Sequence, residues 1–146
     1  MPDATPDPEL TVRDVMQTAV HTVERTAHVA AAAYLMKRWR GSALVVLTDG
    51  ASLVPATLVC DFDVTRAVAD GRDPEATRLV DLDLPEMVGL SPDTPVPEAA
   101  ERMLQAAAAY APVVEDGRLV GLVDVSALCR GLLTGRQQDR LADARP

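Results

Sequence analysis

The stretch Thr11-Val12-Arg13-Asp14-Val15-Met16 returns in altered form 67 residues later, as Arg78-Leu79-Val80-Asp81-Leu82-Asp83. The same spacing relates Val29 to Val96, Met36 to Met103, and Asp49-Gly50 to Asp116-Gly117. After the paired Asp-Gly the spacing shortens to 64 residues, so the first copy carries three additional residues in a surface turn. A small unit that repeats in this way becomes stable by packing on its twin, and a ligand cleft is expected between the copies.

Both copies have the same predicted order of elements. Apolar residues at spacings of three and four predict a helix that begins near Thr26 and a second one that begins at Thr94. The apolar stripe of the second helix is expected to include Leu104 and Ala107. A continuous apolar strand follows each helix, at residues 43–47 and 111–114.

The repeated Asp-Gly pair predicts a type I′ hairpin turn after each of these strands, because both of its residues tolerate positive φ. A returning strand is therefore expected at residues 53–59 and 119–123. Each returning strand runs directly into a short helix, at residues 61–69 and 126–133.

A short opening strand, at residues 20–23 and 88–90, completes the predicted unit. The fold class is thus α/β (α+β), with two β-α-β-β-α units. The expected organisation is a disordered leader (1–9), the first unit (10–77), the second unit (78–134) and a polar tail (135–146) that begins at Gly135.

Composition excludes several classes of partner. The formal charge of −8 and the pI near 4.6 argue against nucleic acid and against an anionic membrane surface. No apolar run reaches the roughly 18 residues that span a bilayer, and the acidic, proline-rich start is not a secretory signal. Cys60 and Cys129 form no metal-binding pair, and reduced thiols in a cytoplasmic protein are expected.

The order of elements, with Asp14-Val15-Met16 at its start, resembles a tandem pair of cystathionine-β-synthase (CBS) domains, called a Bateman module. The most telling stretches are Thr57-Leu58-Val59-Cys60-Asp61-Phe62-Asp63 and Gly117-Arg118-Leu119-Val120-Gly121-Leu122-Val123. The resemblance covers about residues 11 to 133. It implies two units related by pseudo-two-fold symmetry, and a homodimer formed through alanine-rich helices such as those at 30–33 and 106–109.

Members of that family bind adenosine-containing ligands such as AMP, ADP, ATP, S-adenosylmethionine or NAD between the paired units. Their motif is Gly, an apolar residue, any residue, Thr or Ser, two residues, then Asp. The first copy has Thr57, Cys60 and Asp63 at the three defining positions, and the second copy has Gly121, Asp124 and Ala127. Neither copy is intact, and the second site looks lost for nucleotides because Asp124 places a negative charge where a phosphate would sit.

Asp63 is the principal candidate for ligand binding. A carboxylate in the first turn of a helix can accept hydrogen bonds from both hydroxyls of a ribose, while the helix N–H groups favour phosphate. Such charge-assisted bonds are worth roughly 1.5 to 3 kcal/mol. The alternative is that Asp63 only complements the helix dipole, which is worth roughly 0.3 to 1 kcal/mol.

Val20 and His21 precede the opening strand of the first copy and complete the candidate site, where the His21 ring would meet a phosphate. His28, in the first turn of a helix, is read as a solvated residue. The histidines and cysteines have no recognised metal-ligand spacing, and no catalytic motif is present, so neither a metal site nor an enzyme is predicted.

Two functions remain open at this point. The first is a non-catalytic regulatory module, with no required cofactor, that binds an adenosine ligand and acts on a separate protein target. The second is a ligand-free dimeric interaction or scaffold module. In that case Asp63→Ala should change neither stability nor partners.

Overall fold

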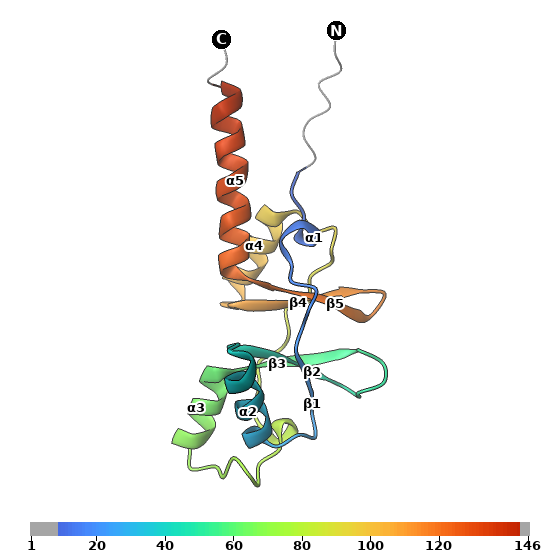
Figure 1. Ribbon diagram of the computed structural model, residues 1–146, viewed down its shortest axis with the longest axis vertical. Helices are drawn as coiled ribbons and strands as arrows, with labels where there is room; N and C mark the ends of the chain where they lie inside the picture. Colours follow the sequence, from blue (N-terminus) through green and yellow to red (C-terminus); the bar gives the residue numbers. More distant parts are fainter. Residues whose placement is uncertain (1–8, 144–146) are drawn as a thin grey trace.

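The apolar strands of the two copies form two sheets that lie next to each other in the middle of the molecule, with the helices on the outer sides (Figure 1). The computed structural model describes residues 9–143, and side chains over residues 9–134. In chain order the elements are α1 (Val12–Val15), β1 (Thr22–Glu24), α2 (Val29–Trp39), β2 (Ala43–Leu47), β3 (Pro55–Cys60), α3 (Asp61–Ala69), the 3-10 helix η1 (Leu79–Asp81), α4 (Val96–Gln105), β4 (Tyr110–Glu115), β5 (Arg118–Asp124) and α5 (Val125–Asp143). This arrangement confirms the predicted α+β fold class.

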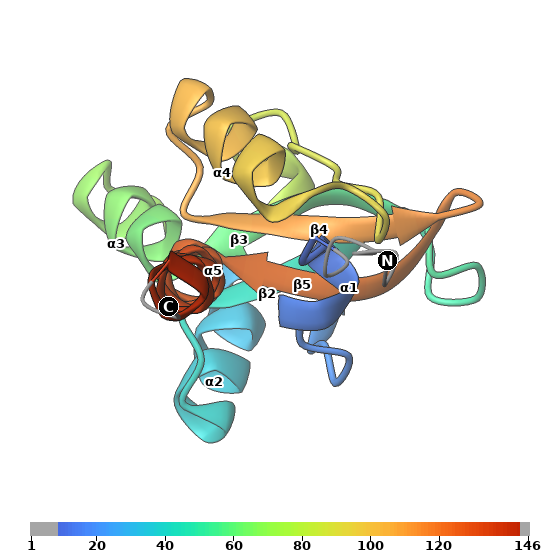
Figure 2. The same ribbon diagram turned by 90° about the horizontal axis from the view of Figure 1, so that it is seen from above.

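The first sheet has the order β1-β2-β3, with β1 parallel and β3 antiparallel to β2. The second sheet is the antiparallel pair β4-β5. Helices α2 and α3 lie against the first sheet, and α4 and α5 lie against the second (Figures 1 and 2). The tips of the two hairpins lie side by side, where the Leu119 N–H donates to the Leu53 carbonyl at 2.8 Å.

Each unit has its own apolar core. The opening segment of each copy packs in the core of the other unit. Val12 in α1 is fully buried in the core of the second unit, and Leu79 in η1 is buried in the core of the first. The Val12 N–H donates to the Thr94 carbonyl at 2.9 Å, and the Leu79 N–H donates to the Ala27 carbonyl at 2.9 Å. Burial of each side chain stabilises by about 1.5–3 kcal/mol, so each unit depends on an opening segment that belongs to the other copy.

The repeated aspartates of these segments cap their short helices. The Asp14 carboxylate accepts the Thr11 N–H at 2.9 Å, and the Asp81 carboxylate accepts the Arg78 N–H at 3.3 Å. A side-chain acceptor of this kind satisfies a backbone donor that a helix start leaves without a partner.

The two Asp-Gly pairs form different turns. Asp116 and Gly117 have φ of 52° and 78° and connect β4 to β5 directly, which confirms the predicted tight turn. The prediction is wrong at Asp49-Gly50, where the connection runs over residues 48–54. There the Asp49 carboxylate instead accepts the N–H groups of Ala51 and Ser52, because the three additional residues allow a wider loop.

The second opening strand is also absent from the described sheet. Leu90 makes only an isolated parallel bridge to Val113. Pro92, two residues later, has no N–H with which to extend the ladder. The second copy is therefore a reduced version of the predicted β-α-β-β-α unit.

Helix bounds differ from the prediction at several points. α2 begins at Val29, three residues after Thr26, and α4 begins at Val96. Leu104 is 74% exposed, and Ala107 follows the end of α4 with φ of 53°, so neither belongs to the buried stripe, and the alanine-rich stretch 106–109 lies outside the helix.

α5 also differs from the prediction. It continues past Gly135 to Asp143, because a single glycine costs a helix only about 1 kcal/mol and good helix formers follow it. The predicted leader, apart from Glu9, and the last three residues of the predicted tail lie outside the described residues.

Candidate functional site

The candidate site is built where β3 passes without a loop into α3. Cys60 is the last residue of β3 and Asp61 is the first of α3, as the sequence predicts for this junction. Asp63 lies in the first turn of α3 and is only 9% exposed. Its Oδ2 accepts the Cys60 N–H at 2.8 Å. The carboxylate therefore caps the helix that carries it.

The second oxygen of Asp63 faces Arg66. Arg66 Nη2 lies 3.7 Å from Asp63 Oδ1 and donates to the Asp83 carbonyl at 3.1 Å. A separation of 3.7 Å is an ion pair but too long for a hydrogen bond, so Oδ1 keeps acceptor capacity. Since Arg66 is half exposed, the ion pair contributes at most about 0.5 kcal/mol.

Asp63 lines a pocket of about 280 Å³. That volume is close to the lower end of the roughly 300–1,000 Å³ range of small-molecule sites. The lining is one face of α3 together with the chain that leads to the second unit: Asp63, Arg66, Ala67, Asp70, Arg72, Leu82 and Asp83. The first five belong to the first unit, and Leu82 and Asp83 belong to the opening segment of the second copy, of which Leu82 packs against the core of the first unit. A ligand cleft between the two copies stays a prediction.

Cys60 is a neutral thiol at ordinary pH. Burial, together with the negative charges of Asp63 and Asp61, raises the pKa of Cys60 to about 11. A protonated thiol is a weak hydrogen-bond donor and a poor nucleophile. Cys60 therefore offers a phosphate much less than the hydroxyl of a threonine or serine would.

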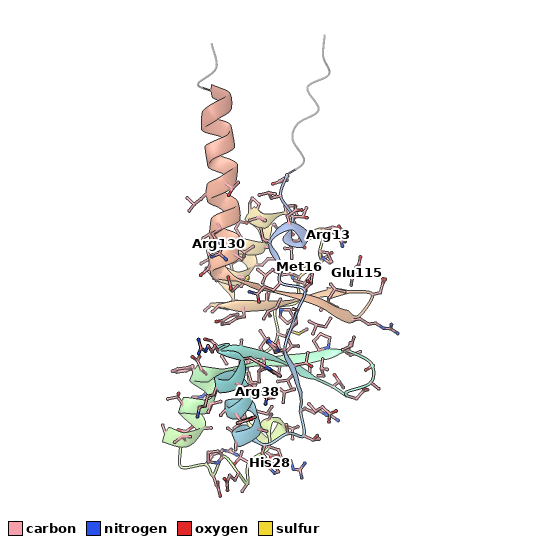
Figure 3. The ribbon with its side chains drawn as sticks, in the orientation of Figure 1. Arg13, Met16, His28, Arg38, Glu115 and Arg130 are labelled. Atoms are coloured by element: carbon pink, nitrogen blue, oxygen red, sulfur yellow. The ribbon has the colours of Figure 1, made fainter. Side chains whose placement is uncertain are left out.

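Thr57 stands where the motif has glycine. Its Oγ1 donates to the Pro85 carbonyl at 2.8 Å and so ties β3 to the connection between the units. At the equivalent Gly121 there is no room for a side chain, because a Cβ would lie 2.6 Å from Met16 Sδ and 2.9 Å from the Gln17 carbonyl oxygen. Met16 lies beside the β4-β5 sheet in Figure 3.

In the second copy the capping carboxylate lies before the helix, and the N–H that it accepts lies within the helix. Asp124 precedes α5, and its Oδ1 accepts the Ala127 N–H at 2.7 Å. In the first copy the carboxylate is on the third helical residue, Asp63, and the acceptor bond runs back to Cys60. The carboxylate at position 124 therefore serves as an N-cap, a role that aspartate at this position already indicates. Ala127 supplies no acceptor for a ribose.

The chain matches the model of the CBS domain at residues 12–54 and 80–134. It is 31% identical over 118 residues to the CBS domain-containing protein YhcV of Bacillus subtilis, a match that covers 80% of this chain and 81% of YhcV. The chain belongs to the CBS domain family. CBSCBSPB2 of Arabidopsis thaliana is also 31% identical, over 121 residues, but the 82% of this chain that matches corresponds to only 22% of that protein.

A solved structure shows the same fold. The CBS domain pair of MJ0100, in complex with 5′-methylthioadenosine and S-adenosyl-L-methionine, superposes with a TM-score of 0.75 at 21% identity. The alignment covers 88% of this chain and 99% of that one. This chain thus has the fold of a CBS domain pair.

The histidines of the CBS pair lie apart from the pocket. The His21 ring stacks on the Trp39 ring, with centroids 3.9 Å apart and planes at 15°. Val20 is partly buried, and neither Val20 nor His21 lines the pocket at Asp63. His28 is the residue that precedes α2 (Figure 3).

Sequence reasoning missed Arg66, although an aspartate and an arginine three residues apart on a helix lie on the same face. Arg130 is its counterpart on α5 (Figure 3). In the second unit the described ion pairs join Arg13 to Asp93 and to Glu115, each at 3.5 Å.

Within residues 9–143, no cluster of three or more His, Cys, Asp or Glu side chains is arranged to hold a metal ion. In the same part of the chain no helix combines the length and the apolar character needed to cross a membrane.

Proposed function

We propose that this CBS pair is a non-catalytic regulatory module whose first unit binds an adenosine-containing ligand at Asp63. The observation that supports it is a carboxylate in the first turn of α3, nine-tenths buried, that lines a pocket along this helix. Its Oδ1 can accept hydrogen bonds from ribose hydroxyls, and its Oδ2 stays with the cap of α3. No cofactor is required for this role.

The ligands to test are AMP, ADP, ATP, S-adenosylmethionine and NAD. The MJ0100 structure contains 5′-methylthioadenosine and S-adenosyl-L-methionine, so we test adenosine compounds of the same chemical class here. Binding would act through the chain between the units, because Arg66 holds both Asp63 and the Asp83 carbonyl. A change at the pocket would thereby alter how the two units sit against each other.

The experiment is isothermal titration and thermal unfolding with each ligand, on the wild type, Asp63→Asn and Asp61→Asn. A ligand at 100 times its dissociation constant stabilises by about 2.7 kcal/mol. Asp63→Asn should weaken binding by about 10-fold or more, since a neutral amide accepts ribose hydrogen bonds less strongly. Asp61→Asn removes the same charge from an exposed residue outside the pocket lining and should not weaken binding as Asp63→Asn does. If no ligand shifts the unfolding temperature, the proposal fails.

We propose further that the pair is a cytoplasmic homodimer that acts on a separate protein target. Each long helix exposes a large apolar side chain: Tyr34 on α2 (59%), Phe62 on α3 (68%), Leu104 on α4 (74%) and Leu133 on α5 (59%). These helix surfaces are where we expect two copies to associate. Sedimentation velocity over a range of concentrations tests it, and a monomer at all concentrations would contradict it.

A ligand-free scaffold is the second candidate. It is favoured by the cap, because Asp63 already has a structural task that does not need a ligand. The titrations above separate the two functions, since a scaffold predicts no binding of any adenosine compound.

A further inference from the structure

The pocket at Asp63 is lined by more negative than positive charge. Three carboxylates, on Asp63, Asp70 and Asp83, and two guanidinium groups, on Arg66 and Arg72, give the lining a formal charge of −1. Arg66 is also engaged by Asp63 and by the Asp83 carbonyl. Arg72 is left as the other positive charge of the lining, against the two carboxylates of Asp70 and Asp83.

The residues around the pocket add further negative charge to that of its lining. Asp61 lies in the first turn of α3 beside Asp63, and the whole chain carries a formal charge of −8. A helix start attracts anions with the equivalent of about half a positive charge. Two carboxylates in that first turn already complement it, so the dipole does not outweigh the negative lining.

The position that contacts phosphate in an intact motif has lost its hydroxyl. Cys60 presents a partly buried thiol, which is a weak hydrogen-bond donor. Thr57 has a hydroxyl, but it donates to the Pro85 carbonyl. Neither residue lines the pocket, so neither offers a hydroxyl to a phosphate chain bound beside Asp63.

We infer that the pocket selects adenosine compounds without a net negative charge and discriminates against the di- and triphosphates. This inference rests on the proposed function and specifies the ligand class of the same site. Asp70 and Asp83 are the residues that set the specificity, because both of these acidic residues line the same pocket as Asp63. Their carboxylates repel a phosphate chain and leave a neutral adenosine unaffected.

The test is isothermal titration of the full chain with adenosine and with ATP, without divalent cations, at low and at high salt. Wild-type protein should bind ATP at least about 10-fold more weakly than adenosine, which is about 1.4 kcal/mol. Added salt should narrow the difference, because it screens repulsion. Asp70→Asn should also narrow the difference in affinity between ATP and adenosine. Asp83→Asn, a second variant on an exposed side chain, should do the same.

The matched control is Asp116→Asn. It makes the same change in net charge at the tip of the β4-β5 hairpin, on the opposite side of the molecule from α3 (Figures 1 and 2). Asparagine also tolerates positive φ, so the turn keeps its shape. This variant should discriminate as the wild type does.

Three results would overturn the inference. ATP binding as tightly as adenosine would refute the selectivity and leave the proposed function intact. An equal effect of Asp116→Asn and Asp70→Asn would assign the selectivity to the overall charge and not to the pocket. Failure of adenosine, ATP and the remaining ligands to bind would remove the proposed function itself, and this inference with it.

Discussion

Replacement of Asp63 by alanine should destabilise the protein even when no ligand is present. The variant loses the bond from the Cys60 N–H to Asp63 Oδ2, which measures 2.8 Å, and it leaves that N–H without its acceptor. Loss of a side-chain cap typically costs about 0.5–2 kcal/mol. The ion pair with Arg66 is half exposed on one side and adds at most about 0.5 kcal/mol. Together these give a loss of about 1–2 kcal/mol.

Urea unfolding followed by circular dichroism measures this loss directly. In a thermal scan the same loss lowers Tm by about 3–8 °C for a domain of this size. Asp63→Asn is the matched control, because its amide oxygen can still accept the Cys60 N–H, and it should lose less than half as much as Asp63→Ala. If both variants unfold within about 0.3 kcal/mol of the wild type, the carboxylate does not cap α3 and the reasoning fails.

Three further predictions follow from contacts in the two units. Gly121→Ala should destabilise by about 1–3 kcal/mol in urea unfolding, because the added methyl group would lie 2.6 Å from a sulfur and 2.9 Å from a backbone oxygen; Gly41→Ala, with nothing within 4 Å, should show no loss. Since burial raises the pKa of Cys60 from 9.0 to about 11, the folded state favours the neutral thiol. The free energy of unfolding should therefore fall as the pH rises from about 9 to about 11, and Cys60→Ala should lack that part of the fall. Thr57→Val removes the donor to the Pro85 carbonyl and should cost about 0.5–1.5 kcal/mol, whereas Thr57→Ser should keep most of the bond.

The Asp63 result also changes how the two candidate functions are told apart. From the sequence, a scaffold predicts that Asp63→Ala leaves stability unchanged. The cap leads us to expect the opposite, because the Asp63 carboxylate accepts the Cys60 N–H whether or not a ligand binds. A loss of stability in that variant is therefore no sign of a ligand site, and only the binding measurements separate a sensor from a scaffold.

The parts of the fold that depend on neighbouring residues could be predicted from the sequence. The helix at 61–69 has the predicted bounds, and the turn at Asp116-Gly117 has the predicted positive φ angles. Both follow from backbone preferences within a few residues. The loop at 48–54 departs from the prediction because its length, and not its Asp-Gly pair, decides its shape.

The features that depend on distant segments could not be predicted. The repeat indicates where each copy begins, but it does not say that Val12 and Leu79 each pack in the other copy. That exchange is set by the backbone bonds at Thr94 and Ala27, which lie far away in sequence. The contact of Thr57 with Pro85 is of the same kind.

The sequence indicates the two carboxylates of the candidate site, Asp63 and Asp124, but not which task each of them has. A strand that runs directly into a helix leaves backbone N–H groups that need an acceptor. The first copy meets that need from the third helical residue, Asp63, and the second from the residue before the helix, Asp124. The Asp63 carboxylate, inside the first turn of α3, also lines the pocket. The Asp124 carboxylate, before α5, accepts the Ala127 N–H. Moving the acceptor by three residues thus keeps α5 capped, and it leaves Ala127 without the oxygen that a ribose would need.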